Sequence, residues 1–112
     1  MFILISSDII RGHIDAIILK LIIEKDRYGY EISKEIGLRT NNTFNVKEAT
    51  LYAAFQRLEK KNLIKSYYGN ITHGGKRKYY QVTLLGKAYF NEKVLEWVDT
   101  KKIINIFLEG SK

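Results

Sequence analysis

The net positive charge of this sequence is concentrated in one segment, and lysine and arginine, which carry it, are side chains that bind phosphate. Between residues 47 and 78, eight lysines and arginines face only Glu48 and Glu59, so this segment carries +6 of the chain's formal net charge of +7. Such a balance favours a polyanionic partner, nucleic acid first and an acidic membrane surface second. The alternative is a solvated basic surface, and charge alone does not decide between them.

The sequence gives little evidence for a catalytic site, a metal site or a membrane segment. The 112-residue chain has no cysteine, which excludes disulfides and thiolate metal sites and fits a reducing cytoplasm. His13 and His73 have no partner at metal spacing, and no catalytic triad, paired-carboxylate setting or phosphate loop stands out. We therefore expect no enzyme, no metal and no cofactor. Residues 1–5 are apolar but lack a basic lead and a cleavage site, and no apolar run approaches the roughly 20 residues that span a bilayer. We predict a cytoplasmic protein.

A helix is predicted over residues 46–61. Leu51, Phe55 and Leu58 recur at four- and three-residue spacing, so one stripe faces a core. The other faces carry small, polar or cationic residues, which allow close approach to an anionic partner: Ala49, Ala53, Gln56 and Lys60, with Thr50, Ala54, Arg57 and Lys61 beside them. Asn62, which tolerates the left-handed conformation, is expected to end this helix.

A two-stranded hairpin is predicted to follow. Residues 64–69 and 76–83 are rich in aromatic and β-branched side chains, and the turn between them ends in Gly74 and Gly75. Lys76, Arg77 and Lys78 come directly after that turn. A helix with a small-residue face followed by a cationic hairpin is the layout of a winged helix-turn-helix DNA reader.

Two earlier helices are needed to position this unit. The first is predicted from an N-cap at Ser7 to Glu24 or Lys25, with an apolar surface too wide for one neighbour. The second is predicted over residues 28–36, with Gly37 either ending it or tolerated inside it. Residues 38–45 form the turn before the recognition helix.

The last helix, capped by Thr83, carries more apolar surface than a domain of this size can cover. Its stripe is interrupted only by Lys101 and consists of Phe90, Val94, Trp97, Ile104 and Leu108. We predict homodimerisation through this helix, helped by the first helix. A two-fold dimer would present two recognition helices about 34–36 Å apart and read a palindrome. The fold class predicted is mainly α with a small β-hairpin wing, comprising a winged helix-turn-helix DNA-binding domain over residues 1–83 and a dimerisation helix over residues 84–112 in one compact unit.

Several segments together resemble the PadR family of transcriptional regulators, in its short form with a single C-terminal helix. They are residues 26–32 (DRYGYEI), 47–52 (KEATLY), 57–64 (RLEKKNLI) and 74–83 (GGKRKYYQVT), with Leu19 and Gly86. The resemblance implies a homodimeric repressor that binds double-stranded DNA and is released from its operator by a small molecule. From the residues and the resemblance together, the predicted DNA contacts are Lys34, Lys47, Ala49, Thr50, Tyr52, Ala53, Gln56, Arg57, Gly75, Lys76, Arg77 and Lys78.

The resemblance also implies an effector site. In short multidrug-sensing members, a tryptophan on the last helix faces its two-fold mate, and the two indoles bracket a flat aromatic ligand. Trp97 falls at that position, and the other positions that line the pore are Ile9, Gly12, Asp15, Ala16, Val94, Lys101 and Ile104. Drug-sensing relatives carry an acid where this chain has Lys101, so either Asp15 partly replaces that acid or the pore prefers a neutral or anionic ligand.

Two other functions stay open at the level of sequence. One is a DNA-binding regulator without a small-molecule inducer, whose pore is closed or answers to a protein. The other is a basic adaptor that binds another protein's helix through its own last helix.

Overall fold

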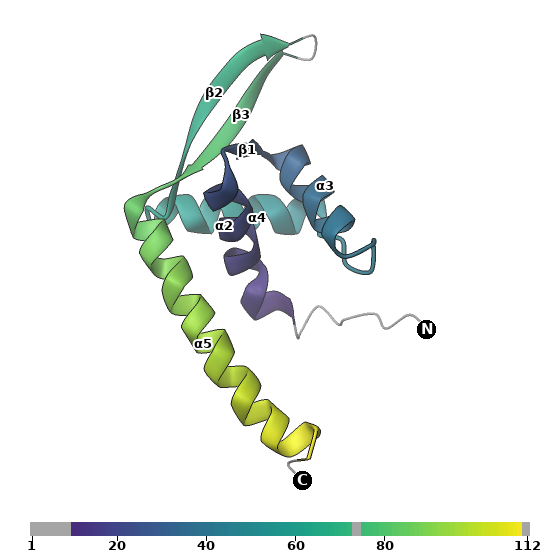
Figure 1. Cartoon of the computed structure of the whole chain (residues 1–112). Helices are drawn as coiled ribbons and strands as arrows, with labels where there is room; N and C mark the ends of the chain where they lie inside the picture. The colour runs from purple at the N-terminus through teal and green to yellow at the C-terminus, as the bar shows by residue number, and fades with distance from the viewer. Residues whose placement is uncertain (1–9, 73–74, 111–112) are drawn as a thin grey trace.

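The computed structural model of this protein describes residues 10–72 and 75–110, without the side chains of residues 70–72. Its elements in chain order are η1 (Arg11–His13), α2 (Ile14–Glu24), β1 (Arg27–Tyr28), α3 (Gly29–Arg39), α4 (Glu48–Lys60), β2 (Ile64–Thr72), β3 (Gly75–Val82) and α5 (Leu84–Leu108). The strands β2 and β3 and the helix α5 extend away from a central group of helices (Figure 1). The radius of gyration is 15.9 Å, against about 13 Å for a compact chain of this length, so the molecule is elongated.

The core lies among α2, α3, α4 and the base of the sheet. Ile18, Leu19 and Ile32 are fully buried there with Phe55 and Leu58 of the predicted apolar stripe. The ring of Phe55 stacks on Tyr80 of β3 at 4.1 Å between centroids, which fixes α4 against the sheet. Ala54 also lies in this core with no exposed surface, so its assignment to the open face of α4 was wrong. Alanine carries no polar group to mark its direction, and its face depends on neighbours that the sequence does not reveal.

The sheet has three antiparallel strands in the order β1-β3-β2, one more than the predicted hairpin. Arg27 pairs with Tyr80 and Tyr28 with Tyr79. The two residues of β1 are too few to show an alternating pattern, which explains why the sequence did not reveal this strand. The mainly α fold with a small β wing is otherwise confirmed.

Helix boundaries follow the predictions closely. The helix α2 ends at Glu24 as predicted, but the 3₁₀ turn η1 interrupts the predicted helix before Ile14. Ser7, the predicted start, lies outside the described residues. The helix α3 continues to Arg39 with Gly37 buried inside it. A Cβ on Gly37 would lie 2.9 Å from the Asn45 side-chain oxygen, so glycine permits close contact between the helix and the following turn. Asn62 has φ of +61°, as expected for the residue that ends α4.

The helix α5 is anchored at its first turn. The Thr83 hydroxyl accepts a hydrogen bond from the Gly86 backbone N–H at 3.0 Å, which confirms the predicted cap. A Cβ on Gly86 would lie 2.1 Å from the Leu63 carbonyl oxygen, so only glycine fits where α5 crosses the start of β2. Beyond this contact α5 extends away from the wing (Figure 1).

Candidate nucleic-acid interface

The outward face of α4 is open to solvent and uncluttered by large side chains. Ala49, Ala53 and Gln56 are exposed there, with Lys60 on the same face and Thr50 beside it. The opposite side packs into the core through Leu51, Phe55 and Leu58. A helix with small residues outward can bring its backbone close to the edges of bases in a major groove.

The turn between α3 and α4 fixes the angle at which α4 is presented. Thr40, the C-cap of α3, donates its hydroxyl hydrogen to the Ile36 carbonyl oxygen at 2.8 Å, and the same hydroxyl accepts from the Phe44 backbone N–H at 3.3 Å. Asn41 and Asn42 have positive φ of 51° and 60°, a conformation that asparagine tolerates better than most residues. These contacts join the two helices of the helix-turn-helix through a defined loop.

The beginning of α3 lies directly against α4. A Cβ on Gly29 would be 3.0 Å from the Tyr52 hydroxyl oxygen, and the Tyr52 ring meets Phe55 edge-on at 5.6 Å. Tyr52 is thus packed at the margin of the core and still 45% exposed. Lys34 lies on α3 and is exposed.

The cations of the wing are exposed but differently supported. Arg77 places its guanidinium carbon 4.6 Å from the ring centroid of Tyr28, which in turn meets Tyr79 edge-on. Lys78 lies on the other side of the strand, with Nζ 3.9 Å from a Glu59 carboxylate oxygen. Gly75 has φ of +99° and begins β3, and the Lys76 side chain that follows it is exposed. His73 and Gly74 lie outside the described residues.

Arg57 has a specific partner. Its Nη2 donates to Asp15 Oδ1 at 2.7 Å and its Nε to Oδ2 at 3.4 Å, which joins α4 to α2. The hydrogen bond that Arg57 donates to Asp15 raises the pKa of Arg57 above its usual value, although desolvation opposes this. This contact joins a predicted DNA contact to a residue predicted to line the effector pore.

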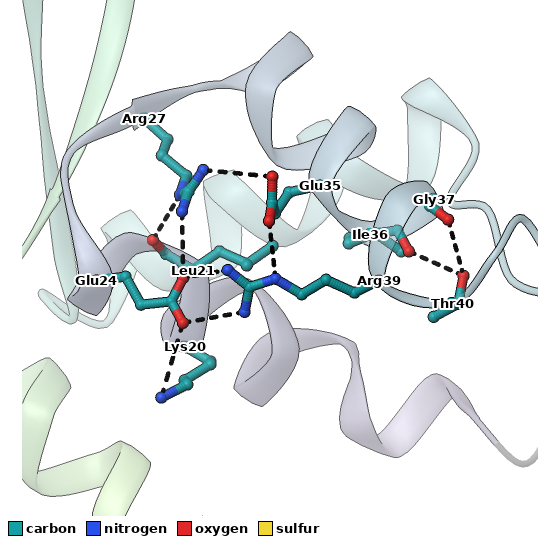
Figure 2. Close-up of polar contacts among 9 residues, drawn as sticks. All are labelled: Lys20, Leu21, Glu24, Arg27, Glu35, Ile36, Gly37, Arg39 and Thr40. Carbon is teal, nitrogen blue, oxygen red and sulfur yellow. Dashed lines mark hydrogen bonds and ion pairs between the residues drawn. The ribbon is translucent and has the colours of Figure 1, made fainter.

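An ion-pair cluster holds α3 on α2 (Figure 2). Arg39 donates to Glu35 Oε1 and to Glu24 Oε2, each at 2.9 Å. Arg27 Nε donates to the Leu21 carbonyl oxygen at 2.9 Å, and Arg27 Nη2 to Glu24 Oε1 at 3.1 Å. The hydrogen bond from Arg39, supported by the charges of the neighbouring cations, lowers the pKa of Glu24 to about 2. This cluster was not predicted from the sequence, although Glu35 and Arg39 have the i, i+4 spacing of a helical pair.

Comparisons with known proteins agree with this arrangement. The profile of the transcriptional regulator PadR-like family matches residues 18–92. An uncharacterized protein of Lysinibacillus sphaericus is 66% identical over 107 residues, covering 96% of this chain and 98% of that protein. A transcriptional regulator from Clostridium thermocellum superposes with a TM-score of 0.87 at 55% identity, covering 93% of this chain and 98% of that one. A PadR family transcription regulator from Clostridium difficile gives a TM-score of 0.75 at 48% identity, covering 87% and 99%.

The chain belongs to the PadR-like family of transcriptional regulators. Membership in this family implies DNA binding. Its members are generally not enzymes. No helix among the described residues is long and apolar enough to cross a membrane. Within the same residues, no group of three metal-ligating side chains is close enough to hold an ion.

The PadR-like chain has a groove of about 500 Å³ between α2, α3 and α5. Of the predicted pore residues, Gly12, Ala16, Val94 and Trp97 line it, whereas Asp15, Lys101 and Ile104 do not, and Ile9 lies outside the described residues. His13 meets the Trp97 indole edge-on at 5.0 Å, and Lys101 Nζ lies 5.9 Å from the indole centroid. Phe44 and Phe90 also line the groove. Phe90 was predicted to belong to the apolar stripe of the last helix but not to the pore, and Phe44 was not predicted because it belongs to a turn that has no helical period.

Proposed function

We propose that this PadR-like protein is a cytoplasmic transcriptional repressor that binds a palindromic operator as a homodimer. The exposed face of α4 supports this proposal most directly. Ala49, Ala53 and Gln56 form an open reading surface, while the wing adds the exposed cations Lys76, Arg77 and Lys78. In this proposal α4 reads bases and the wing cations neutralise backbone phosphates, so the wing supplies affinity and salt dependence but little sequence choice.

The dimer in this proposal forms through α5, with help from the N-terminal helical region. Large apolar side chains along α5 are exposed, among them Leu95 at 67%, Phe107 at 77% and Leu108 at 79%. Large apolar side chains left exposed in this number on one helix are typical of an interaction site in a soluble protein. The same pairing assigns dimerisation to the segment of residues 84–112, which contains α5, and DNA binding to residues 1–83.

The repressor is released by a flat aromatic molecule bound between Trp97 and its mate, as in the short drug-sensing type represented by LmrR. Trp97 is 46% exposed and lies in the groove, so a large aromatic face is accessible for stacking. The ligand acts by favouring a dimer angle at which the two α4 helices no longer match successive major grooves. It must bind that angle better than the DNA-competent one, because equal affinity for both shifts nothing.

Arg77→Glu tests the DNA-binding role. Replacing the cation with an acid removes one phosphate contact and adds repulsion, so affinity for a labelled duplex in low salt should fall at least about tenfold, with a shallower salt dependence. Fluorescence anisotropy across a salt series measures both quantities. Lys25→Glu makes the same charge change at an exposed position outside the wing and α4 and serves as the control. Equal binding by Arg77→Glu and the unaltered protein contradicts the proposal.

A second candidate is a DNA-binding regulator without a small-molecule inducer. The contacts of His13 and Lys101 with the Trp97 indole favour it, because they already occupy part of the aromatic surface. Fluorescence of the single tryptophan separates the two candidates. Quenching by planar aromatic compounds supports the inducer, and unchanged emission across a chemically varied panel supports the regulator without one.

A further inference from the structure

The ion pair between Asp15 and Arg57 joins the recognition helix to the helix behind it. Both Nη2 and Nε of Arg57 face the carboxylate, at 2.7 Å and 3.4 Å from its two oxygens. The Asp15 side chain is 19% exposed, whereas that of Arg57 is 48% exposed. A two-pronged contact of this kind orients the guanidinium as well as balancing its charge.

Arg57 also borders the proposed DNA-reading surface. It lines one hollow together with Thr50, Ala53 and Lys47, all on or at the start of α4. Thr50 and Arg57 are seven residues apart and therefore lie on the same side of the helix. Arg57 is thus a cation beside the expected path of a DNA strand, held by a carboxylate of the same chain.

A phosphate and a carboxylate bind a guanidinium through the same pair of N–H groups. Each offers two oxygens to a pair of parallel N–H groups, and the Nε and Nη2 edge of Arg57 can serve only one of them at a time. In addition, a paired Asp15 neutralises Arg57, so a nearby phosphate is attracted less strongly even before the contact exchanges.

We propose that Asp15 competes with DNA phosphate for Arg57 and thereby lowers the sequence-independent affinity of this protein for DNA. The inference rests on the proposed DNA-binding function and adds a residue that sets specificity. Non-specific binding depends almost entirely on phosphate contacts, whereas operator binding also draws on base contacts. Withholding one phosphate-binding arginine therefore weakens binding to arbitrary sequences more, in proportion, than binding to the operator.

The test uses Asp15→Asn and a fluorescent duplex of arbitrary sequence. Release of Arg57 should tighten binding about three- to tenfold at low salt and steepen the slope of log K against log salt by about 0.9, the value for one additional phosphate contact. Glu92→Gln makes the same change in net charge at an exposed position on α5 and should leave the slope unchanged. In an Arg57→Gln background, Asp15→Asn should no longer alter the slope.

Several results overturn the inference. A duplex affinity for Asp15→Asn equal to that of Glu92→Gln, or weaker than that of the unaltered protein, contradicts competition while leaving DNA binding intact. If the unaltered protein binds no duplex at any salt concentration, the proposed function fails and this inference fails with it.

Asp15 lines a second hollow with the cations Arg11, Lys93 and Arg57, so its replacement could also reduce stability. A measurement on the unaltered protein avoids this problem. At saturation with a duplex of arbitrary sequence, the NMR signal of the Asp15 carboxyl carbon should keep its chemical shift, because Arg57 stays paired with Asp15 and is withheld from phosphate. A shift that also appears when Arg57→Gln removes the pair shows that Arg57 has left Asp15, and contradicts the inference.

Discussion

The helices α4 and α5 differ in the burial of their apolar residues. The thirteen residues of α4 bury Leu51, Ala54, Phe55 and Leu58 within the chain's own core. The twenty-five residues of α5 bury only Gly86, and its larger apolar side chains remain at the surface. A helix stabilised by its own core needs no partner, whereas the exposed apolar face of α5 calls for a second surface.

The first turn of α5 is held in place by hydrogen bonds of Thr83, whereas the rest of the helix leaves most of its apolar side chains exposed. Thr83 donates its hydroxyl hydrogen to the Asn62 carbonyl oxygen at 2.7 Å and accepts from Gly86, so the helix start is fixed to the end of α4 and to β2. We propose that a change in the direction of α5 is transmitted through this contact to the end of α4. This arrangement suits a regulator whose dimer angle controls its two recognition helices.

Two phenylalanines provide the largest expected contrast. Phe55→Ala should lower the free energy of unfolding by about 3–5 kcal/mol, because a fully buried ring is replaced by a cavity. Urea denaturation followed by circular dichroism measures this loss. A loss below about 1 kcal/mol contradicts the placement of Phe55 in the core.

Phe107→Ala is the matched change on α5, where the side chain is 77% exposed. It should leave the helical content unchanged and weaken the dimer by about 1.5–3 kcal/mol for each ring removed from the interface. Sedimentation equilibrium over a concentration series measures the dissociation constant. An unchanged dissociation constant places Phe107 outside the interface and restricts dimerisation to the earlier part of α5.

The sequence was most informative where a physical pattern extends over several turns. Leu51, Phe55 and Leu58 predicted the buried side of α4, and Thr83 predicted the start of α5, because periodicity and capping are local properties. The contacts of Arg57 with Asp15 and of Arg77 with Tyr28 depend on residues distant in sequence and could not be deduced from spacing. The partner of the apolar stripe on α5 could not be predicted from a local pattern either. Exposed apolar residues indicate an interaction surface, but they do not define the geometry of the interaction.

Gly86→Ala should have the next largest effect. The added methyl group would lie 2.1 Å from the Leu63 carbonyl oxygen, which is backbone and cannot rotate away, so we expect a loss of about 3 kcal/mol in unfolding free energy. Gly12→Ala is the control, since a Cβ there has no heavy atom within 4 Å. Equal melting temperatures for the two variants contradict the close packing of α5 on β2.

The smallest expected effect concerns the ion-pair cluster between α2 and α3. Since the folded-state pKa of Glu24 is about 2, below its ordinary value of 4.5, its contribution to stability is present above about pH 4.5 and is lost as the pH falls toward 2. Glu24→Gln should therefore be less stable than the unaltered protein at pH 7, and the difference should shrink across this window. Urea midpoints at pH 7, 4 and 2.5 test this, and a difference independent of pH contradicts the assignment.

The central claim is that two α4 helices, joined through α5, read one duplex together. Selection of bound sequences from a random pool of duplexes tests it most directly. The account predicts enrichment of an inverted repeat whose half-sites are about 10–10.5 base pairs apart, centre to centre. Enrichment of a single asymmetric site, or no enrichment at all, contradicts it.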